Sequence, residues 1–355
     1  MEILTHLFSA RFKKLGFLPR KRTPQGKRVA LSGPPRCGKT RLLINRALES
    51  GGSFLYLDLA DPRLSGQDFS HELNVFAQEK GVGFLAIDNY RPEFDLPQNI
   101  PEIWLASQAE YSPQNYRGHR LWPLDFEEFL AFHRKPDEPQ LLFNEFLREG
   151  TLPETVGLEE FVRIQRWQEI LRLSFEDKTE SAIYGWYLDR NGFSLSAHQA
   201  YCALKGVMKI SKDRLYHLTR RLVDERFLVA LEKYRAPNAP SKLYAYDHAL
   251  RQAVTFDRAL SRTFEGMVAM ELIKQGRRAF YADYIDVYLP DEDRAVIVQA
   301  FPTVESLHLR ANLIAPELKV RRVEFVTMGF AYQREAPGQW IEALPFWEWA
   351  LRENP

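Results

Sequence analysis

The sequence predicts an α/β protein built on a parallel sheet with helices on both faces, followed by two smaller folded parts. Short apolar runs typical of strands alternate with helical patterns from Lys27 to about Pro136, and the first run leads directly into a glycine-rich turn and a helix. Two helices followed by two alternating apolar runs, between about Ser194 and Asp247, predict a winged helix-turn-helix.

Bulk composition bounds the class of protein. The 355 residues are 45% hydrophobic, enough for a sizeable core spread over two or three domains. The 48 Lys and Arg nearly cancel the 47 Asp and Glu, so no whole-chain field points to nucleic acid or a membrane. Cys37 and Cys202 are far apart, which argues against a disulfide framework and a zinc site. With no signal peptide and no bilayer-spanning apolar run, we expect a cytoplasmic protein without a membrane partner.

The elements expected in the first half of the chain form the parallel sheet and its helices. The predicted strands are Val29–Ser32, Phe54–Leu57, Phe84–Ile87 and Ile103–Ala106. Asp125 with Glu128 three residues later makes a capping box, which predicts a helix through Phe132. From Leu141 to Tyr187 the pattern is helical.

The elements expected in the second half form the winged helix and a small α/β domain. Ser211 is a good N-cap for the second helix of the winged part. A further helix and four strands are expected at 264–274, 279–281, 285–289, 295–298 and 323–326. We therefore divide the chain into a basic N-terminal helix or arm (1–26), a sheet domain (27–140), a helical connector (141–193), a winged helix (194–250) and the last domain (251–355).

A phosphate-binding loop follows the first strand. Its residues are Gly33, Pro34, Pro35, Arg36, Cys37, Gly38, Lys39 and Thr40. Between a strand and a helix, such a string turns backbone N–H groups and a helix N-terminus toward an anion. We expect Lys39 to reach the β- and γ-phosphates of ATP and Thr40 to bind Mg²⁺. An ordinary glycine turn before a helix is the alternative, which this context disfavours.

A carboxylate at the end of a neighbouring strand is also needed near the magnesium ion. Asp88 ends the run Phe84–Ile87 and is our first candidate for the Walker B aspartate, with Mg²⁺ bound by Thr40 and Asp88. Asp58, which ends the run Phe54–Leu57, is the competing candidate because both runs fit the same description.

Several strings together resemble a prokaryotic AAA-type ATPase family that carries a winged helix and a C-terminal restriction-endonuclease-like domain. The resemblance rests on the phosphate-binding loop, on Tyr56–Arg63, on the string Pro123-Leu124-Asp125-Phe126-Glu127-Glu128-Phe129, on Gly150–Glu154 and on Phe264–Ala269. It implies a P-loop NTPase fold for the first domain and ATP as the nucleotide, since the residues alone do not distinguish ATP from GTP.

The chain departs from the family pattern at positions that matter for hydrolysis. Asn89 stands where the family has a glutamate that polarises the attacking water, and an amide cannot accept that proton. We expect ATP to be bound but hydrolysed slowly, with Asp58 or Asp61 as a substitute base. Ser107, or Gln108 beside it, takes the sensor position. Arg120, or alternatively Arg117, is the candidate arginine for the transferring phosphoryl group, and a solvated surface arginine is the alternative for each.

The last domain departs as well. Nucleases of this type place an aspartate on one strand and Glu-x-Lys on the next. Asp286 fits the first position, but the next strand ends in Gln299, and Glu317 with Lys319 lies outside any expected strand. We therefore expect nuclease activity to be absent.

A nucleic-acid surface is expected on the second helix of the winged part. Its basic side chains are Lys212, Arg214, His217, Arg220 and Arg221. The alternatives are a merely solvated face, or a face that packs on the ATPase domain. A second basic cluster, also open to a solvated reading, comprises Arg11, Lys13, Lys14, Arg20, Lys21, Arg22, Lys27 and Arg28.

The sequence thus favours a weak ATPase or nucleotide-dependent switch, in which the ATP state controls the winged helix and an inactive nuclease-like domain. The main alternative is a DNA-binding regulator with ATP as a ligand only. An ATP-gated nuclease ranks last. The partners expected are ATP and DNA, with an oligomer or protein partner left open.

Overall fold

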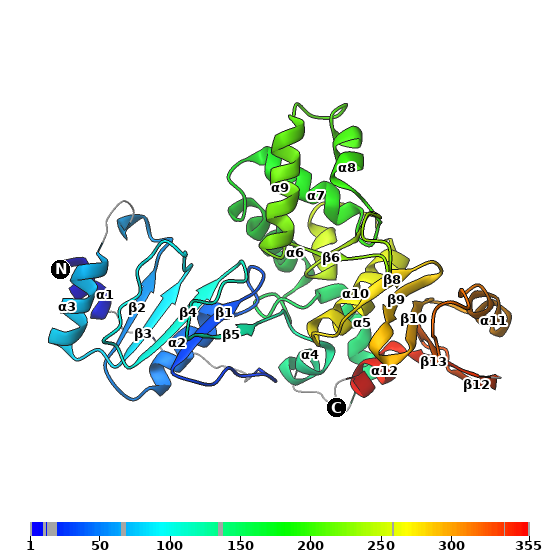
Figure 1. Ribbon diagram of the computed structural model, residues 1–355, viewed down its shortest axis with the longest axis horizontal. Coiled ribbons are helices and arrows are strands. Elements are labelled where there is room, and N and C mark those ends of the chain that lie inside the picture. Colours follow the sequence, from blue (N-terminus) through cyan, green and yellow to red (C-terminus); the bar gives the residue numbers. More distant parts are fainter. Residues whose placement is uncertain are drawn as a thin grey trace. The chain divides into compact units, whose positions relative to one another are not determined.

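The computed structural model describes residues 2–9, 12, 20–64, 69–133, 138–257, 259–336 and 338–353. Two compact units make up the chain (Figure 1): the first comprises Met1–Pro123 with Asp224–Arg226, and the second comprises Leu124–Val223 with Phe227–Pro355. Within the described ranges, none of the helices combines the length and apolar character that a membrane crossing requires.

The first unit is built on a parallel five-stranded sheet in the order β2-β3-β4-β1-β5. Its strands are β1 (Arg28–Ser32), β2 (Phe54–Asp58), β3 (Phe84–Asp88), β4 (Glu102–Ser107) and β5 (Arg117–Arg120). The four predicted strands are confirmed. Sequence reasoning missed β5 because its residues, Arg-Gly-His-Arg, are polar and mostly exposed at the sheet edge.

Helices cover both faces of this sheet, as alternation along the strands requires. The helices are α1 (Glu2–Phe8), α2 (Lys39–Glu49), the short η1 (Pro62–Leu64) and α3 (Ser70–Lys80). Leu55 and Leu57 of β2 pack in one core with residues of α1 and α3. Phe54 and Tyr56, one residue out of step, face the opposite core, which includes Leu43 of α2. Together with the glycine-rich loop between β1 and α2, this is the P-loop NTPase fold.

Helix α4 opens the second unit, which contains α4 (Phe126–His133), α5 (Pro139–Glu149), α6 (Glu160–Leu173), α7 (Lys178–Asp189) and η2 (His248–Ala253). The predicted capping box is confirmed, since Asp125 Oδ1 accepts from the N–H of Glu128 at 2.8 Å. Phe126 and Phe129 each pack edge-to-face on Phe146, at 5.1 and 5.0 Å between ring centroids. This aromatic packing groups α4 with the second unit, whereas sequence analysis placed it within 27–140; that boundary stays a prediction.

The winged helix-turn-helix lies within the second unit. It comprises α8 (Ala197–Leu204), α9 (Lys212–Asp224) and the antiparallel hairpin β6 (Leu228–Leu231) with β7 (Lys242–Ala245). Leu215, Leu218 and Leu222 of α9 are buried in its core, as their spacing predicts. Ser211 caps α9 by accepting from the N–H of Arg214 at 3.3 Å.

A six-stranded sheet completes the second unit, in the order β12-β13-β11-β10-β9-β8. Its strands are β8 (Phe280–Ala282), β9 (Ile285–Leu289), β10 (Arg294–Val298), β11 (Arg322–Thr327), β12 (Tyr332–Ala336) and β13 (Gln339–Pro345). The helices of this part are α10 (Leu260–Lys274), η3 (Pro290–Glu292), α11 (Val304–Asn312) and α12 (Phe346–Glu353). The central strands β10, β11 and β13 run parallel, and β8, β9 and β12 pair antiparallel at the sides.

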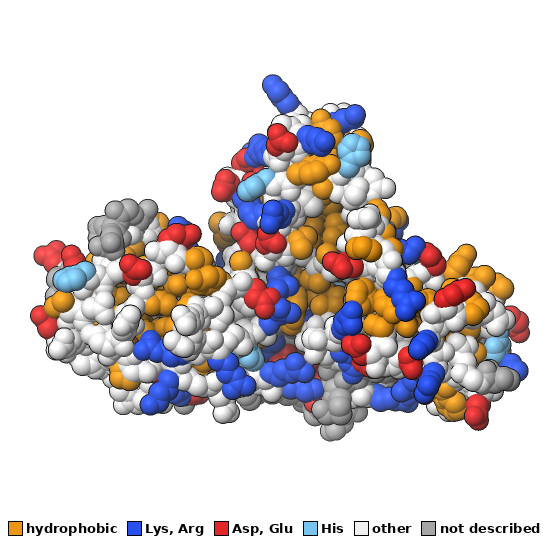
Figure 2. All heavy atoms as spheres, in the orientation of Figure 1, with side chains coloured by type: hydrophobic (Ala, Val, Ile, Leu, Met, Phe, Trp, Pro, Cys, Tyr) orange, Lys and Arg blue, Asp and Glu red, His pale blue; other side chains and the backbone are white. Residues whose placement is uncertain are grey.

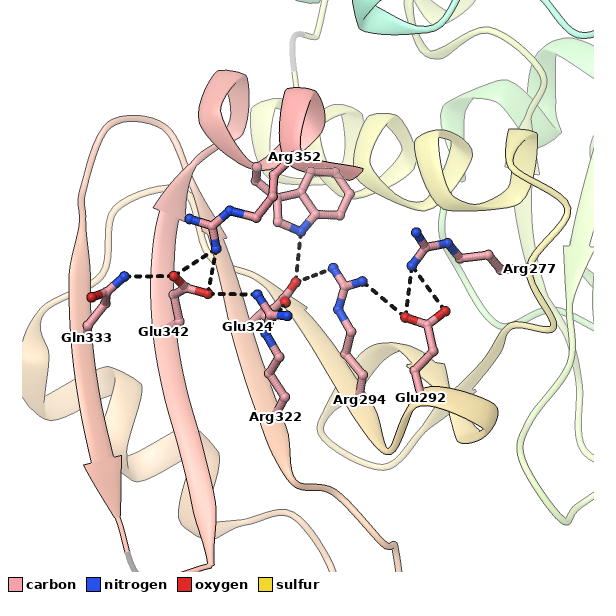
Figure 3. A network of polar contacts seen from close by, with 9 residues as sticks. Arg277, Glu292, Arg294, Arg322, Glu324, Gln333, Glu342 and Arg352 are labelled. Atoms are coloured by element: carbon pink, nitrogen blue, oxygen red, sulfur yellow. Dashed lines mark hydrogen bonds and ion pairs between the residues drawn. The ribbon is translucent and has the colours of Figure 1, made fainter. Parts of the chain in front are cut away.

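A buried network of ion pairs crosses this sheet beside α12 (Figure 3). Glu324 of β11, 1% exposed, pairs with Arg294 of the neighbouring strand and accepts from the indole N–H of Trp349 at 3.0 Å. Glu342 of β13, directly opposite Glu324, pairs with Arg352 at 2.9 Å. Buried carboxylates on a sheet are stable only when cations and donors surround them in this way.

Candidate functional site

The phosphate-binding loop is shaped by backbone that only glycine tolerates. Gly38 has a φ of 105°, in the left-handed region, immediately before α2 begins at Lys39. At Gly33 a Cβ would lie 2.0 Å from the carbonyl oxygen of Leu121, so no larger residue fits there. The loop therefore leads from β1 into the N-terminus of α2 with its backbone tightly turned, the arrangement that binds phosphate.

The side chain of Lys39 is folded into the loop. It is 9% exposed, and its ammonium donates to the carbonyl oxygens of Gly33 and Pro34, each at 2.8 Å. The ammonium group that we expect to bind phosphate therefore contacts two carbonyl oxygens of the loop itself.

Thr40 and Asp88 meet where sequence analysis expected a magnesium site. The hydroxyl of Thr40 donates to Asp88 Oδ2 at 2.5 Å, and the phenol of Tyr56 donates to the same oxygen at 3.0 Å. Burial, together with the carboxylates of Asp88 and Asp58, raises the pKa of Tyr56, so the phenol remains a donor at neutral pH. Hydroxyl and carboxylate oxygens are the ligands that Mg²⁺ prefers, so Thr40 and Asp88 fit this ion.

Asp58 and Asn89 form a second pair at the ends of β2 and β3. The amide of Asn89 donates to Asp58 Oδ1 at 2.7 Å, and the N–H of Ala60 donates to the same oxygen at 2.9 Å. Asn89 itself has a φ of 52°, which asparagine tolerates better than most residues. The competing aspartates therefore differ in their surroundings: Asp88 contacts the P-loop threonine, and Asp58 contacts Asn89.

The sensor candidates lie at the end of β4, between β1 and β3. Ser107 is buried, and its hydroxyl donates to the carbonyl oxygen of Ala109 at 2.8 Å. The carbonyl oxygen of Gln108 accepts from the N–H of Gly33 at 3.3 Å. The end of β4 is thus joined to the beginning of the phosphate-binding loop.

The two arginine candidates lie at opposite ends of the short strand β5. Arg120 is paired with Ser32, the last residue before the loop, whereas Arg117 is paired with Val29 near the start of β1. The side chain of Arg120 forms an ion pair with Glu110. Of the two, Arg120 lies at the end of the sheet that carries the loop.

Arg20 is a further residue at the loop, and sequence reasoning placed it only in a basic cluster. It is 8% exposed and donates to the carbonyl oxygens of Cys37 at 2.9 Å and Trp122 at 2.8 Å. Lys21 and Arg22 beside it are exposed. No signal in the sequence separates a buried arginine from its solvated neighbours. Arg11, Lys13 and Lys14 of that cluster lie outside the described residues.

The basic residues of α9, in the winged helix, differ in their exposure and in their ion pairs. Lys212, Arg214, His217 and Arg220 are exposed, and Arg221 is half-buried. Arg221 pairs with Glu180 of α7 at 2.6 Å, and Arg214 pairs with Asp177, the N-cap of α7. Figure 2 shows Lys and Arg side chains interspersed with Asp and Glu over this part. The surface therefore carries a mixed charge.

In the last part of the chain, Asp286 lies on β9, and Gln299 follows the neighbouring β10. The amide of Gln299 donates to the hydroxyl of Ser306 at 2.8 Å. Glu317 and Lys319 lie between α11 and β11, outside any strand. Lys242, Glu265 and Arg310 lie near Asp286, and sequence reasoning singled out none of the three.

Comparison with solved structures finds distant likenesses. The chain is similar to AMPPCP-bound DnaA from Aquifex aeolicus, with 15% identity over 63% of this chain and 86% of that chain and a TM-score of 0.27. It is also similar to the Aeropyrum pernix ORC1 protein in complex with DNA, with 14% identity over 67% of this chain and 89% of that chain and a TM-score of 0.30. Likenesses this weak carry no conclusion about activity. No family model and no curated protein sequence matches the chain.

Proposed function

We propose that the first unit binds ATP with Mg²⁺ and hydrolyses it slowly, as the nucleotide-dependent switch of an AAA-type protein. The observation that carries this proposal is the contact of Thr40 with Asp88, next to a loop into which Lys39 is folded. Bound Mg²⁺ would supply positive charge to the phosphates, while Lys39 and the N-terminus of α2 would bind phosphate oxygens.

Slow hydrolysis follows from the residues beside Asp88. Asn89 has no proton-accepting group, and its amide is bound to Asp58. Asp58 is the carboxylate that we assign as the base, because among the described residues Asn89 and Ala60 both donate to its Oδ1, which leaves Oδ2 to accept from water. The proposed sensor is Ser107 and the proposed phosphoryl-binding arginine is Arg120.

In this proposal the nucleotide state controls the second unit, whose last part is an inactive relative of restriction-endonuclease-like domains. Gln299 lies at the position where such a nuclease carries the lysine of its Glu-x-Lys pattern. Glu317 and Lys319, which match that pattern in sequence, lie outside the sheet. Both observations favour a regulatory role for that domain over cleavage.

The test measures ATP binding with a fluorescent analogue, and ATP turnover, in the wild-type protein and in Lys39→Ala and Asn89→Glu. Lys27→Ala, an exposed lysine next to β1, is the matched control. We expect Lys39→Ala to weaken binding at least tenfold and Lys27→Ala to leave it unchanged. Asn89→Glu should raise turnover above that of the wild type, and its melting temperature is checked because glutamate tolerates the φ of residue 89 less well.

Two outcomes contradict the proposal. Equal affinity of the wild type and Lys39→Ala for ATP would show that this loop is not the nucleotide-binding site. Brisk hydrolysis by the wild type shows that Asn89 does not limit the reaction.

A second candidate function is that of a DNA-binding regulator in which ATP is only a ligand. It is favoured by the exposed Lys212, His217 and Arg220 on α9 of the winged helix. Duplex binding that depends on salt and is unaffected by loss of hydrolysis separates this candidate from the switch.

A further inference from the structure

A lysine ammonium joins two carboxylates that come from different elements of the second unit. Lys242 Nζ of β7 lies 2.7 Å from Glu265 Oε1 of α10 and 3.2 Å from Asp286 Oδ1 of β9. The three side chains are between 14% and 21% exposed. This lysine belongs to the hairpin of the winged helix, whereas Asp286 belongs to the six-stranded sheet.

Other donors orient each carboxylate toward the lysine. The phenol of Tyr244 donates to Glu265 Oε1 at 2.7 Å. The N–H of Val298 donates to Asp286 Oδ2 at 2.9 Å, leaving Oδ1 for the ammonium. Arg310 lies 3.7 Å from Asp286 Oδ2, whereas Lys242 contacts Oδ1. The two carboxylates therefore converge on one cation.

Two carboxylates this near to one another are stabilised by a positive charge between them or by a proton on one of them. Burial and the charge of Asp286 both raise the pKa of Glu265, whereas Lys242 lowers it. Oxygen ligands of this kind commonly hold a divalent cation, at about 2.0–2.6 Å from each oxygen. An ammonium at hydrogen-bonding distance from both carboxylates fills the same space.

We propose that the ammonium of Lys242 takes the place of a metal ion between Glu265 and Asp286 and prevents a divalent cation from binding there. The same contacts join the wing, which is the β6–β7 hairpin of the winged helix, to the six-stranded sheet. This deepens the proposed role of an inactive nuclease-like domain, on which it rests for its biological meaning. The charge that a metal would bring is supplied by the chain itself.

The wing is also held by contacts that do not involve Lys242. The N–H of Tyr234 donates to the carbonyl oxygen of Tyr281 at 2.8 Å, and the N–H of Tyr281 donates to that of Glu232 at 2.9 Å. Lys233 pairs with Asp283 at 2.7 Å in a far more exposed position. Replacing Lys242 therefore leaves the backbone link intact, and Lys233 offers a matched control.

The experiment titrates nucleotide-free, full-length protein with Mn²⁺ and follows free Mn²⁺ by electron paramagnetic resonance. All variants carry Thr40→Ala, so that the proposed P-loop metal site does not contribute and failure of that site does not affect the result. The variants are Asp286→Asn, Lys242→Ala, Lys242→Met, each Lys242 variant combined with Asp286→Asn, and Lys233→Ala. Circular dichroism checks folding, and Lys242→Met retains the apolar stem if Lys242→Ala does not fold.

We expect the Thr40→Ala parent and Lys233→Ala to show no Mn²⁺ site that depends on Asp286. Lys242→Ala or Lys242→Met should gain one site, at least tenfold tighter than any binding by the parent, and Asp286→Asn should abolish it. The proposal is overturned if the parent already binds Mn²⁺ at a site that Asp286→Asn removes, or if neither Lys242 variant gains a site.

Discussion

The side-chain amide of Asn89 donates to Asp58 Oδ1 at 2.7 Å, across the ends of two adjacent parallel strands. In the function that we propose, Asn89 takes the position of the base and its amide binds the carboxylate of Asp58. The proposal therefore assigns the role of base to Asp58.

Asp58→Asn should lower ATP turnover to the level of Lys39→Ala while ATP binding stays within about twofold of the wild type. Loss of a positioned base typically reduces a rate by about 10²–10⁴-fold. Asp61→Asn is the matched control. The Arg63 guanidinium lowers the pKa of Asp61 to about 2, which makes it a poor base. Steady-state phosphate release measures both, and a loss in Asp61→Asn alone would reverse the assignment.

Arg20→Ala should weaken ATP binding by about tenfold or more, because the loop loses the hydrogen bond from this buried cation to Cys37 and, with it, the link to Trp122. Hydrogen bonds to charged groups contribute about 1.5–3 kcal/mol each. The neighbouring exposed Arg22→Ala is the control and should bind as the wild type does. Equilibrium binding of a fluorescent nucleotide provides the measurement, and identical affinities for the two variants would show that Arg20 does not shape the loop.

Lys212→Ala should reduce the salt dependence of duplex binding, lowering the slope of log K against log salt by about 1, as expected when one phosphate contact is lost. Arg221→Ala should leave that slope unchanged, because Arg221 is paired with Glu180. Fluorescence anisotropy at several salt concentrations distinguishes the two. If the wild type binds no duplex, α9 does not contact DNA, and its exposed face is either solvated or a packing surface.

Glu271→Gln should flatten the pH dependence of stability. Burial raises the pKa of Glu271 from 4.5 to about 7, although its Oε1 lies 3.3 Å from Lys274. Because the folded pKa exceeds the unfolded one, the stabilisation from the protonated form is full below pH 4.5 and is lost as the pH rises through about 7.

The wild type should therefore lose about 3 kcal/mol over that interval relative to Glu271→Gln. Denaturant unfolding at several pH values measures this difference. The exposed Glu317→Gln serves as the control and should follow the wild type. Parallel curves for wild type and Glu271→Gln would contradict the raised pKa, because they require this carboxyl to bind protons equally in the folded and unfolded chains.

What could be predicted from the sequence depended on how local the signal is. The phosphate-binding loop and Asp88 are encoded within short stretches, since a glycine turn and an apolar strand ending in an acid are local patterns. The contacts of Tyr56 with Asp88 and of Arg20 with Cys37 join residues far apart in sequence, and no periodicity reports them.

The sequence pattern also failed to predict strand β13 and the packing partners of α4, because both depend on residues that meet only in the folded chain. Strand β13 carries the buried Glu342 within an otherwise apolar run, and that acid is tolerated only because Arg352 and Arg322 lie beside it. The capping box of α4 predicted where the helix begins, but its partners Phe146 and Phe346 become neighbours only in the folded chain.

The ion-pair network beside α12 also constrains how this chain can diverge. Glu324 and Arg294 lie side by side on adjacent strands, 1% and 4% exposed, so a change at either one alone leaves a buried charge poorly compensated. Replacing both by apolar residues of similar volume removes that penalty. The residues at these two positions should therefore covary among homologous sequences.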